Sequence, residues 1–180
     1  MTEVAARREK LEQLFQSHYP SVRAYAGRRV PAETVDDVVA STFMVVWRRL
    51  DRVPSDALPW LLAVARNVIA TERRTAARRR SLVERLQRND PREAYDPSPQ
   101  IDRSAPIAEA LARLSARDRE AITLVAWEEL TPSEAALVLG QSQTAFRVRL
   151  HRAKKRLRDE LQAPAPANAA CGLLKEGPGD

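Results

Sequence analysis

Apolar side chains recur along the chain at intervals of three and four residues, the period of an α-helix, and alternating apolar and polar segments are nearly absent. The segment 3–29 is therefore predicted to be helical, with Pro20 in the first turn of a second helical piece. The apolar stripe of this segment consists of Leu11, Leu14, Phe15, Val22, Tyr25 and Ala26.

A second helix is predicted from about Ala32 to Leu50. Acidic residues crowd its first turn, where carboxylates complement the helix dipole. Its recurring apolar residues predict a buried stripe. The members of that stripe are Val35, Val38, Val39, Phe43, Val46 and Trp47.

A third helix is predicted from about Ala57, after a loop at 51–59 that contains two prolines. Its far end carries an arginine run, ATERRTAARRR at 70–80. The residues expected to face inward are Trp60, Leu61, Val64, Val68 and Ile69.

Residues 86–105 change character, because prolines and acidic residues replace the apolar period, and this composition is typical of a linker. The sequence thus predicts an all-α protein of two small helical domains, 1–85 and 106–162, joined by a flexible linker at 86–105. The last segment, 163–180, has the composition of a disordered tail and holds the single cysteine, Cys171.

Four helical patterns follow the linker. SARD at 115–118 resembles a capping box with Asp in place of Glu, and TPSE at 131–134 is a full one. Gly140 supplies a left-handed stop, and Ser142 caps the last helix. Two helices joined by a short glycine-containing turn are typical of a helix-turn-helix. In its second helix, Phe146, Leu150, Ala153 and Leu157 form the stripe that anchors it.

The net charge is +6 and the pI is about 10.1. The positions of the charged residues along the chain say more about function than these totals. Seven basic residues and no acidic one lie between Arg147 and Arg158. Such a face is either a solvated surface or a nucleic-acid contact. The capped first helix and the glycine turn favour the contact, with Arg147 and Arg152 suited to guanine, Gln143 to adenine and Val148 to a thymine methyl.

Both halves of the chain resemble the extracytoplasmic-function (ECF) sigma factors of the sigma-70 family. LFQSHYPSVRAYAGRRV, VDDVVASTFMVVWRRL and PWLLAVARNVIATERRTAARRR are similar to successive parts of the family's region 2. LARLSARDREAITLVAWEELTPSEAALVLGQSQTAFRVRLHRAKKRL is similar to region 4. The resemblance covers roughly residues 8–161 in the family's order. It implies a bacterial protein that binds core RNA polymerase, directs it to a promoter and helps to open the DNA.

The resemblance also implies roles for particular residues. Region 4 would bind the distal (−35) promoter element through Gln143, Thr144, Arg147, Val148, Arg149, His151, Arg152 and Lys155. Region 2 would bind the upstream (−10) element of the transcription bubble through Trp60, Arg66, Asn67, Arg73, Arg74 and Arg78, with a flipped base held by the loop at about 52–58. Core polymerase would be bound through Asp36, Asp37, Ala40 and Ser41. Trp60 is equally explained as a core residue, and Asp36 and Asp37 as a complement to the helix dipole.

Three departures from the family's pattern stand out. Ala40 and Ser41 replace a usual Gln-Glu pair, and this change bears on the core contact. Gln143 and Thr144 replace a frequent Val-Gly pair, and Val148 replaces a small polar residue. These last changes indicate an altered promoter sequence.

The implied partners are the polymerase core, through its β′ coiled coil and β flap, promoter DNA, and an anti-sigma factor of the kind that holds many relatives. No catalytic residue, metal site, cofactor or membrane span is expected, and a cytoplasmic location follows from the cysteine count and the charged N-terminus. Two alternatives remain open at this point. One is a stand-alone dimeric helix-turn-helix regulator, and the other is a basic RNA- or ribosome-associated protein.

Overall fold

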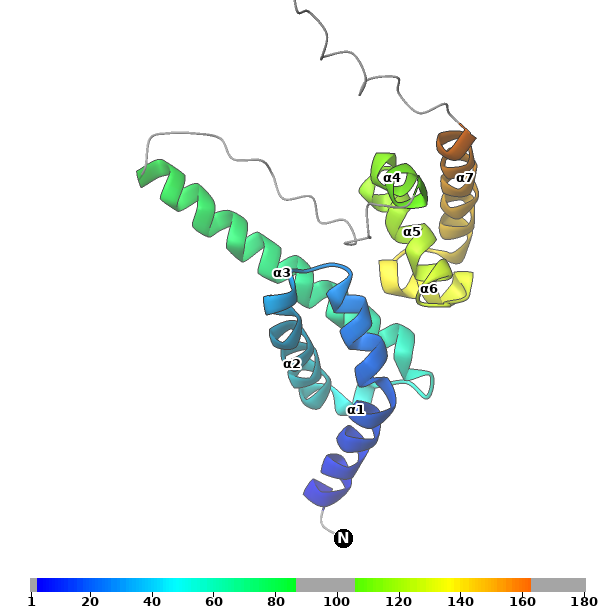
Figure 1. Cartoon of the computed structure of the whole chain (residues 1–180). Coiled ribbons are helices and arrows are strands. Elements are labelled where there is room, and N and C mark those ends of the chain that lie inside the picture. The colour runs from blue at the N-terminus through cyan, green and yellow to red at the C-terminus, as the bar shows by residue number, and fades with distance from the viewer. Residues whose placement is uncertain (1–2, 87–105, 163–180) are drawn as a thin grey trace, which may run out of the picture.

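The computed structural model describes residues 3–86 and 106–162, and every regular element within these ranges is a helix. The all-α prediction is confirmed. The predicted linker beyond residue 86, the tail 163–180 and Cys171 lie outside the described residues. Two groups of helices, the N-terminal unit (α1–α3) and the C-terminal unit (α4–α7), lie side by side (Figure 1).

The N-terminal unit consists of α1 (Glu3–Gly27), α2 (Ala32–Arg48), a short 3₁₀ helix (Leu50–Arg52) and α3 (Ala57–Leu86), which pack on one another. The apolar stripes meet in one core, as the helical period predicts. Its most completely buried side chains are Val22, Tyr25, Val38, Thr42, Val46, Leu50, Leu61 and Leu62.

Two sequence-based predictions for this unit are wrong. α1 runs through Pro20 as one helix, although proline removes a backbone donor. The packing of Val22 and Tyr25 just beyond the proline, both fully buried, holds the helix together. Trp47 was predicted to be buried, but 38% of it is exposed, and the Arg7 guanidinium lies over its ring at 5.4 Å.

The C-terminal unit consists of α4 (Pro106–Arg113), α5 (Ala116–Ala126), α6 (Pro132–Leu139) and α7 (Gln143–Gln162). Thr131 and Glu134 form the predicted capping box, and Gly140 ends α6 with φ of +63°. The Ser142 hydroxyl accepts from the Ala145 N–H at 3.2 Å, which confirms the predicted cap of α7. These caps fix the direction in which α7 leaves the turn.

The start of α5 differs from a reciprocal capping box. The Ser115 hydroxyl accepts from the Asp118 N–H at 3.2 Å, as predicted. The Asp118 carboxylate, however, pairs with Arg156 of α7 and so ties α5 to α7. The buried Arg119 guanidinium donates to the carbonyls of Leu111, Ala112 and Leu114 at the end of α4.

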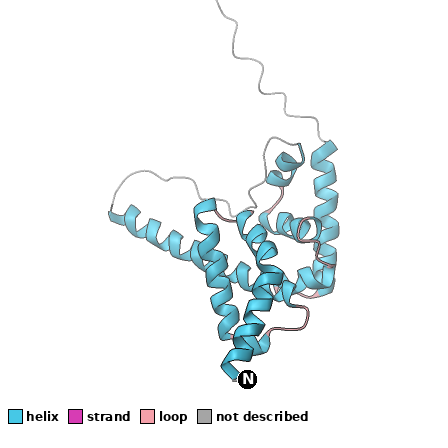
Figure 2. Cartoon of the chain, turned by 60° about the horizontal axis from the view of Figure 1, so that its bottom comes forward, coloured by secondary structure: helices cyan, strands magenta, loops and turns pink. Residues whose placement is uncertain are grey.

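The two units touch where α3 passes α6 (Figures 1 and 2). Polar side chains of α1 also reach across to α5 and the turn after it. Residues that are far apart in sequence therefore share one interface, and its geometry determines which candidate site residues are accessible.

Candidate nucleic-acid interface

The outward face of α7 carries most of the residues predicted to read the distal element. Phe146, Leu150 and Ala153 are buried and anchor the helix in the C-terminal unit. The opposite side chains are exposed, in agreement with the helical period. These exposed candidates are Gln143, Thr144, Arg147, Val148, His151, Arg152 and Lys155.

Val148 is 46% exposed and places an apolar surface on the outer face of α7. It lines a shallow hollow together with Thr144 and Arg152, next to Asp118 and Arg156. The α7 face thus combines an apolar surface with guanidinium and hydroxyl donors. Such a mixture suits base edges and phosphates in a major groove.

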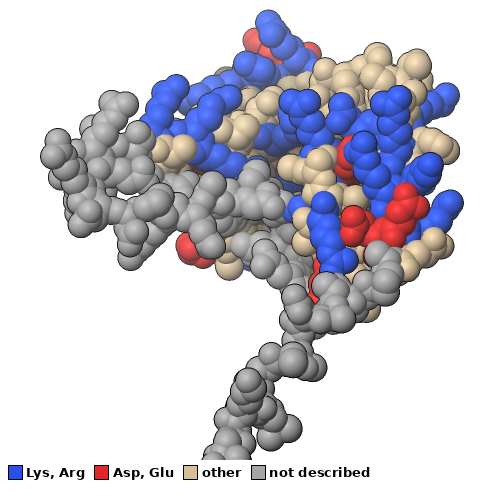
Figure 3. Space-filling view, turned by 90° about the horizontal axis from the view of Figure 1, so that it is seen from above, with Lys and Arg blue, Asp and Glu red and all other residues tan. Residues whose placement is uncertain are grey.

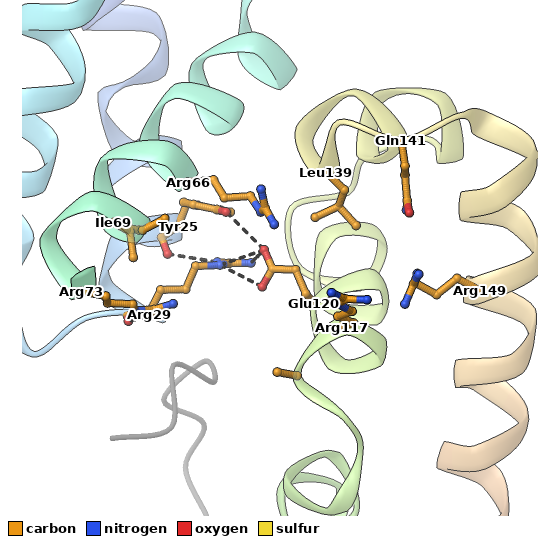
Figure 4. Close-up of a pocket in the computed structure, with 12 residues that line it drawn as sticks. Tyr25, Arg29, Arg66, Ile69, Arg73, Arg117, Glu120, Leu139, Gln141 and Arg149 are labelled. Carbon is orange, nitrogen blue, oxygen red and sulfur yellow. Dashed lines mark hydrogen bonds and ion pairs between the residues drawn. The ribbon is translucent and has the colours of Figure 1, made fainter. Parts of the chain in front are cut away.

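Arg149 departs from the rest of the predicted distal-element set. It is half-buried and reaches toward the N-terminal unit (Figure 4), although it also lines the hollow that contains Val148. The sequence contains a signal for this position, because Arg149 lies three residues after Phe146 and four before Ala153, both buried. It therefore shares a side of α7 with the anchoring stripe.

The predicted −10 residues on α3 are spread over several surroundings. Trp60 is half-buried and packs against the core, whereas Arg74 and Arg78 are exposed. Arg66 and Arg73 line a cavity that faces the C-terminal unit. Arg73 also donates to the backbone carbonyl of Arg29 at 2.6 Å, so its side chain is held at the end of α1.

Asn67 is exposed in a groove between α2 and α3, beside Ser41 and Met44. The loop predicted to hold a flipped base lies elsewhere, since Val53, Pro54 and Ser55 line a separate groove with α1. These two grooves have no lining residue in common. The structure does bring Asn67 next to Ser41, a residue predicted to contact core polymerase.

The other predicted polymerase contacts form an acidic, exposed strip on α2. Asp36, Asp37 and Ala40 are exposed, and Ser41 is half-buried. Asp36 pairs with Arg23 of α1 at 3.5 Å. Asp37 makes no ion pair within the described residues, so its carboxylate is available to a cationic partner.

A polar network connects the two units. The Arg29 guanidinium pairs with Glu120 at 3.2 Å and with Glu128 at 3.1 Å, and Arg28 pairs with Glu128 as well. The Tyr25 hydroxyl donates to Glu120 at 3.2 Å, and the Arg29 guanidinium lies 3.6 Å from the centre of the Tyr25 ring. This network joins α1 to α5 and to the turn that follows α5.

Burial and nearby charges shift the pKa values of two members of the network, Tyr25 and Arg29. Burial raises the pKa of the Tyr25 hydroxyl far above its ordinary value, so Tyr25 remains a donor to Glu120. Burial alone would lower the pKa of Arg29, but contacts with Tyr25, Glu120 and Glu128 outweigh it and raise that pKa. Arg29 is therefore a permanent buried cation whose neutralisation depends on the other unit.

A cavity of about 390 Å³ lies beside this network, between α1 and α3 on one side and α5 to α7 on the other (Figure 4). Arginines from both units line it, and Glu120 is the one acidic residue of its lining among residues 3–86 and 106–162. The lining arginines are Arg29, Arg66, Arg73, Arg117 and Arg149.

Basic side chains also cover much of the surface. Lys and Arg spread over the face seen from above, with Asp and Glu in smaller groups (Figure 3). Among residues 3–86 and 106–162, no cluster of His, Cys, Asp and Glu could hold a metal ion. In the same ranges, no helix combines the length and apolar character needed to cross a membrane.

The interdomain network has no local signal in the sequence. Arg29 meets Glu120 and Glu128 across 91 and 99 positions of chain, and nothing local to either segment indicates the pairing. Arg28 and Arg29 follow α1 as an ordinary pair of basic residues at a helix end, and Glu128 follows α5 in a turn. Only the packing of α3 on α6 brings them together.

Comparison with known proteins gives consistent matches over both units. Residues 14–79 match the family "Sigma-70 region 2" and residues 104–157 match "Sigma-70, region 4". The chain is 35% identical to the RNA polymerase sigma factor NccH of Alcaligenes xylosoxydans xylosoxydans, over 84% of this chain and 86% of that protein. It is 32% identical to the ECF RNA polymerase sigma factor SigL of Mycobacterium tuberculosis, over 88% and 92%.

A solved structure with a similar fold is that of the sigma factor RpoE from Bartonella quintana in complex with the anti-sigma factor NepR. The two folds align with a TM-score of 0.59 at 25% sequence identity, over 86% of this chain and 98% of that one.

Proposed function

Since the chain belongs to the ECF sigma factors of the sigma-70 family, we propose that α7 binds the distal promoter element while α2 and α3 bind core polymerase and the melted upstream element. An RNA polymerase sigma factor directs transcription initiation and is a regulatory protein rather than an enzyme. The proposal concerns the residues that perform this work in the present chain.

The observation that carries the proposal is the exposed face of α7 behind a firmly capped turn. The capping box at Thr131 and the left-handed Gly140 hold α6 and α7 in a defined helix-turn-helix. Residues near the start of α7 would meet base edges, and Arg152 and Lys155 farther along would meet bases and phosphates. Val148 would contact a thymine methyl group, because its apolar surface lies on the same exposed face.

In the N-terminal unit, Asn67 would bind a base edge of the melted strand, because its amide offers both a donor and an acceptor. Arg74 and Arg78 are exposed along α3 and would bind backbone phosphates. The groove between α2 and α3 that contains Asn67 supports a binding position between these helices. We place the base pocket there instead of at the loop 52–58.

Core polymerase would be held by the acidic strip of α2, with Asp37 as its free carboxylate. An anti-sigma factor would restrain the chain, as one is bound by RpoE in the similar solved structure. The protein would work in the cytoplasm, where polymerase and chromosomal DNA are present. The segments 1–85, 86–105, 106–162 and 163–180 would then be the polymerase and −10 domain, the linker, the −35 domain and the tail.

The packing of the two units has a consequence for this mechanism. Arg66 and Arg73 line the interdomain cavity, where they face α5–α7. The C-terminal unit therefore occupies one side of the space in which a melted strand would meet these two arginines. Two elements on one duplex are separated by at least one helical turn, about 34 Å. We therefore propose that the observed closed arrangement opens when the sigma factor joins polymerase and promoter.

A transcription assay with purified core polymerase tests the proposed function. Core alone should give no run-off product from a cognate promoter, which is found by sequencing the DNA retained by the assembled holoenzyme. Addition of this chain should give a defined product, and a basic RNA-associated protein would give none. Specific DNA binding should also be weak for the free chain and strong with core, whereas a dimeric regulator would bind equally in both cases.

A further inference from the structure

The interdomain cavity brings together cations that no acidic residue of the described chain neutralises. Glu120 is its one acidic lining residue, and Arg29 already pairs with it. Within residues 3–86 and 106–162, Arg66, Arg117 and Arg149 have no ion-pair partner. They come from α3, α5 and α7, so both units contribute positive charge to one cavity that is open to solvent.

Like charges that line one cavity repel one another and so oppose the packing of the two units. Arg66 and Arg149 extend into the gap from opposite sides, and Arg117 lies between them (Figure 4). The closed arrangement therefore leaves a repulsion that a bound anion would turn into an attraction. An anion that touches both units would favour the closed form by binding it more tightly than the open one.

The remaining lining describes the ligand further. The side-chain nitrogen of Gln141 is buried and has no hydrogen-bond partner, although it lies at the cavity. Ile69 and Leu139 add an apolar surface on the two sides. A volume of about 390 Å³ falls within the range of small-molecule sites. The site thus offers guanidinium forks for phosphates and an apolar wall.

We propose that this cavity binds a small oligophosphate, such as a nucleoside di- or triphosphate, and that the ligand holds the two units together. The phosphates contact Arg66, Arg117 and Arg149, and the base lies against Leu139. The ligand competes with the melted DNA strand for Arg66. It acts on the free chain, so this inference is independent of the roles proposed for α7 in promoter binding.

Titration calorimetry on the full chain without DNA or polymerase tests the proposal, with GTP, pyrophosphate and adenosine as probes at fixed ionic strength. GTP and pyrophosphate should bind with one site per chain, and adenosine should not bind. Arg66→Gln and Arg149→Gln should each weaken binding by about tenfold, as loss of a charge-assisted hydrogen bond predicts. Arg158→Gln, the same charge change at an exposed position of α7, should alter affinity less than about twofold.

The proposal requires that ligand binding depend on an arginine from each of the two units. Binding that responds to only one of Arg66→Gln and Arg149→Gln, or equally to Arg158→Gln, would overturn the proposal by showing general attraction to a basic surface. A short single-stranded oligonucleotide distinguishes the other source of phosphates. If the oligonucleotide binds with this dependence and GTP and pyrophosphate do not, the cavity belongs to the DNA path and the proposal is wrong.

Circular dichroism checks that both variants fold. Small-angle scattering gives the second readout, since saturating GTP should keep the wild-type chain compact at a salt concentration that expands it without ligand. Expansion that is unchanged by bound GTP would contradict the bridging role.

Discussion

Arg29, just after α1, and Glu128, in the turn after α5, form an ion pair in which both side chains are almost completely buried, with 3% and 4% exposed and 3.1 Å between the charged atoms. Arg29 also pairs with Glu120, so removal of the Glu128 charge leaves the buried Arg29 guanidinium with one anionic partner instead of two. This pair is thus the most sensitive point of the contact between the two units.

Glu128→Gln should open the contact between the units. Arg29 regains solvent when the units separate, so we expect a larger radius of gyration and faster amide exchange in α5, while each unit stays helical. Glu129→Gln is a matched control in the same turn, because Glu129 is exposed and pairs with no described residue. A radius unchanged by Glu128→Gln would show that other contacts close the protein.

Arg147→Ala and Arg152→Ala should weaken binding to the distal element and spare core binding. A lost base contact is worth about 1–3 kcal/mol, which is a loss of about 5- to 150-fold in affinity. Footprinting of the holoenzyme measures the effect, and Lys154→Ala, another exposed cation of α7, is the control. Reduced affinity for core polymerase would refute the assignment.

Asn67→Ala should reduce strand opening more than duplex binding. Its amide lies in the α2–α3 groove, where we place the melted strand. Permanganate reactivity of bubble thymines should fall, while retention of closed complexes on a gel stays nearly constant. Glu72→Gln, in the same groove, should leave permanganate reactivity unchanged. Unaltered reactivity in Asn67→Ala would place the melted strand elsewhere.

Gly140→Ala should lower the stability of the C-terminal unit by about 1 kcal/mol, because an L side chain rarely adopts a φ of +63°. An added Cβ would meet nothing within 4 Å, so the expected loss comes from the backbone alone. Thermal unfolding measures it, and Gly140→Asn should lose less because asparagine tolerates this conformation. Equal losses for both variants would point to a steric cause instead.

The contact between Asp56 and Glu134 should respond to pH. Burial and a hydrogen bond to Glu134 raise the pKa of Asp56, so the folded chain favours the protonated carboxyl. The stabilising effect is complete below the ordinary pKa of 3.8 and is lost as pH rises through the elevated one. Asp56→Asn should remove this dependence, measured as amide exchange in α6 between mildly acidic and neutral pH. A dependence that persists would come from another group.

The helices and their caps were predictable because their causes are local. The Thr131 and Ser142 caps and the Gly140 stop are short-range chemistry, and the stripes of α2 and α7 follow the helical period. Pro20 misled the prediction because tertiary packing compensates for its missing donor. Trp47 was predicted wrongly because the helical period gives only the side of the helix, and at this position the cover is the charged side chain of Arg7 and not an apolar core.

In the candidate site, too, the features with local causes were predictable and those that depend on tertiary packing were not. The exposed α7 face followed from periodicity and charge, and the family resemblance supplied its role. The inward position of Arg149 was encoded in its spacing from Phe146 and Ala153, but the basic composition of the helix obscured it. The pairing of Arg29 with Glu128 depends on how two separately folded units meet, and no local pattern contains that information.

The Arg73 side chain donates a hydrogen bond to the Arg29 carbonyl and is also proposed to bind the melted strand. It would therefore link strand binding to opening of the contact between the two units. If Arg73 leaves this carbonyl to bind a phosphate of the melted strand, the end of α1 that carries the interdomain cations loses one of its supports. The coupling is reciprocal by thermodynamic necessity: whatever favours release of the C-terminal unit increases affinity for the strand by the same factor. Promoter engagement and opening of the protein would then be cooperative.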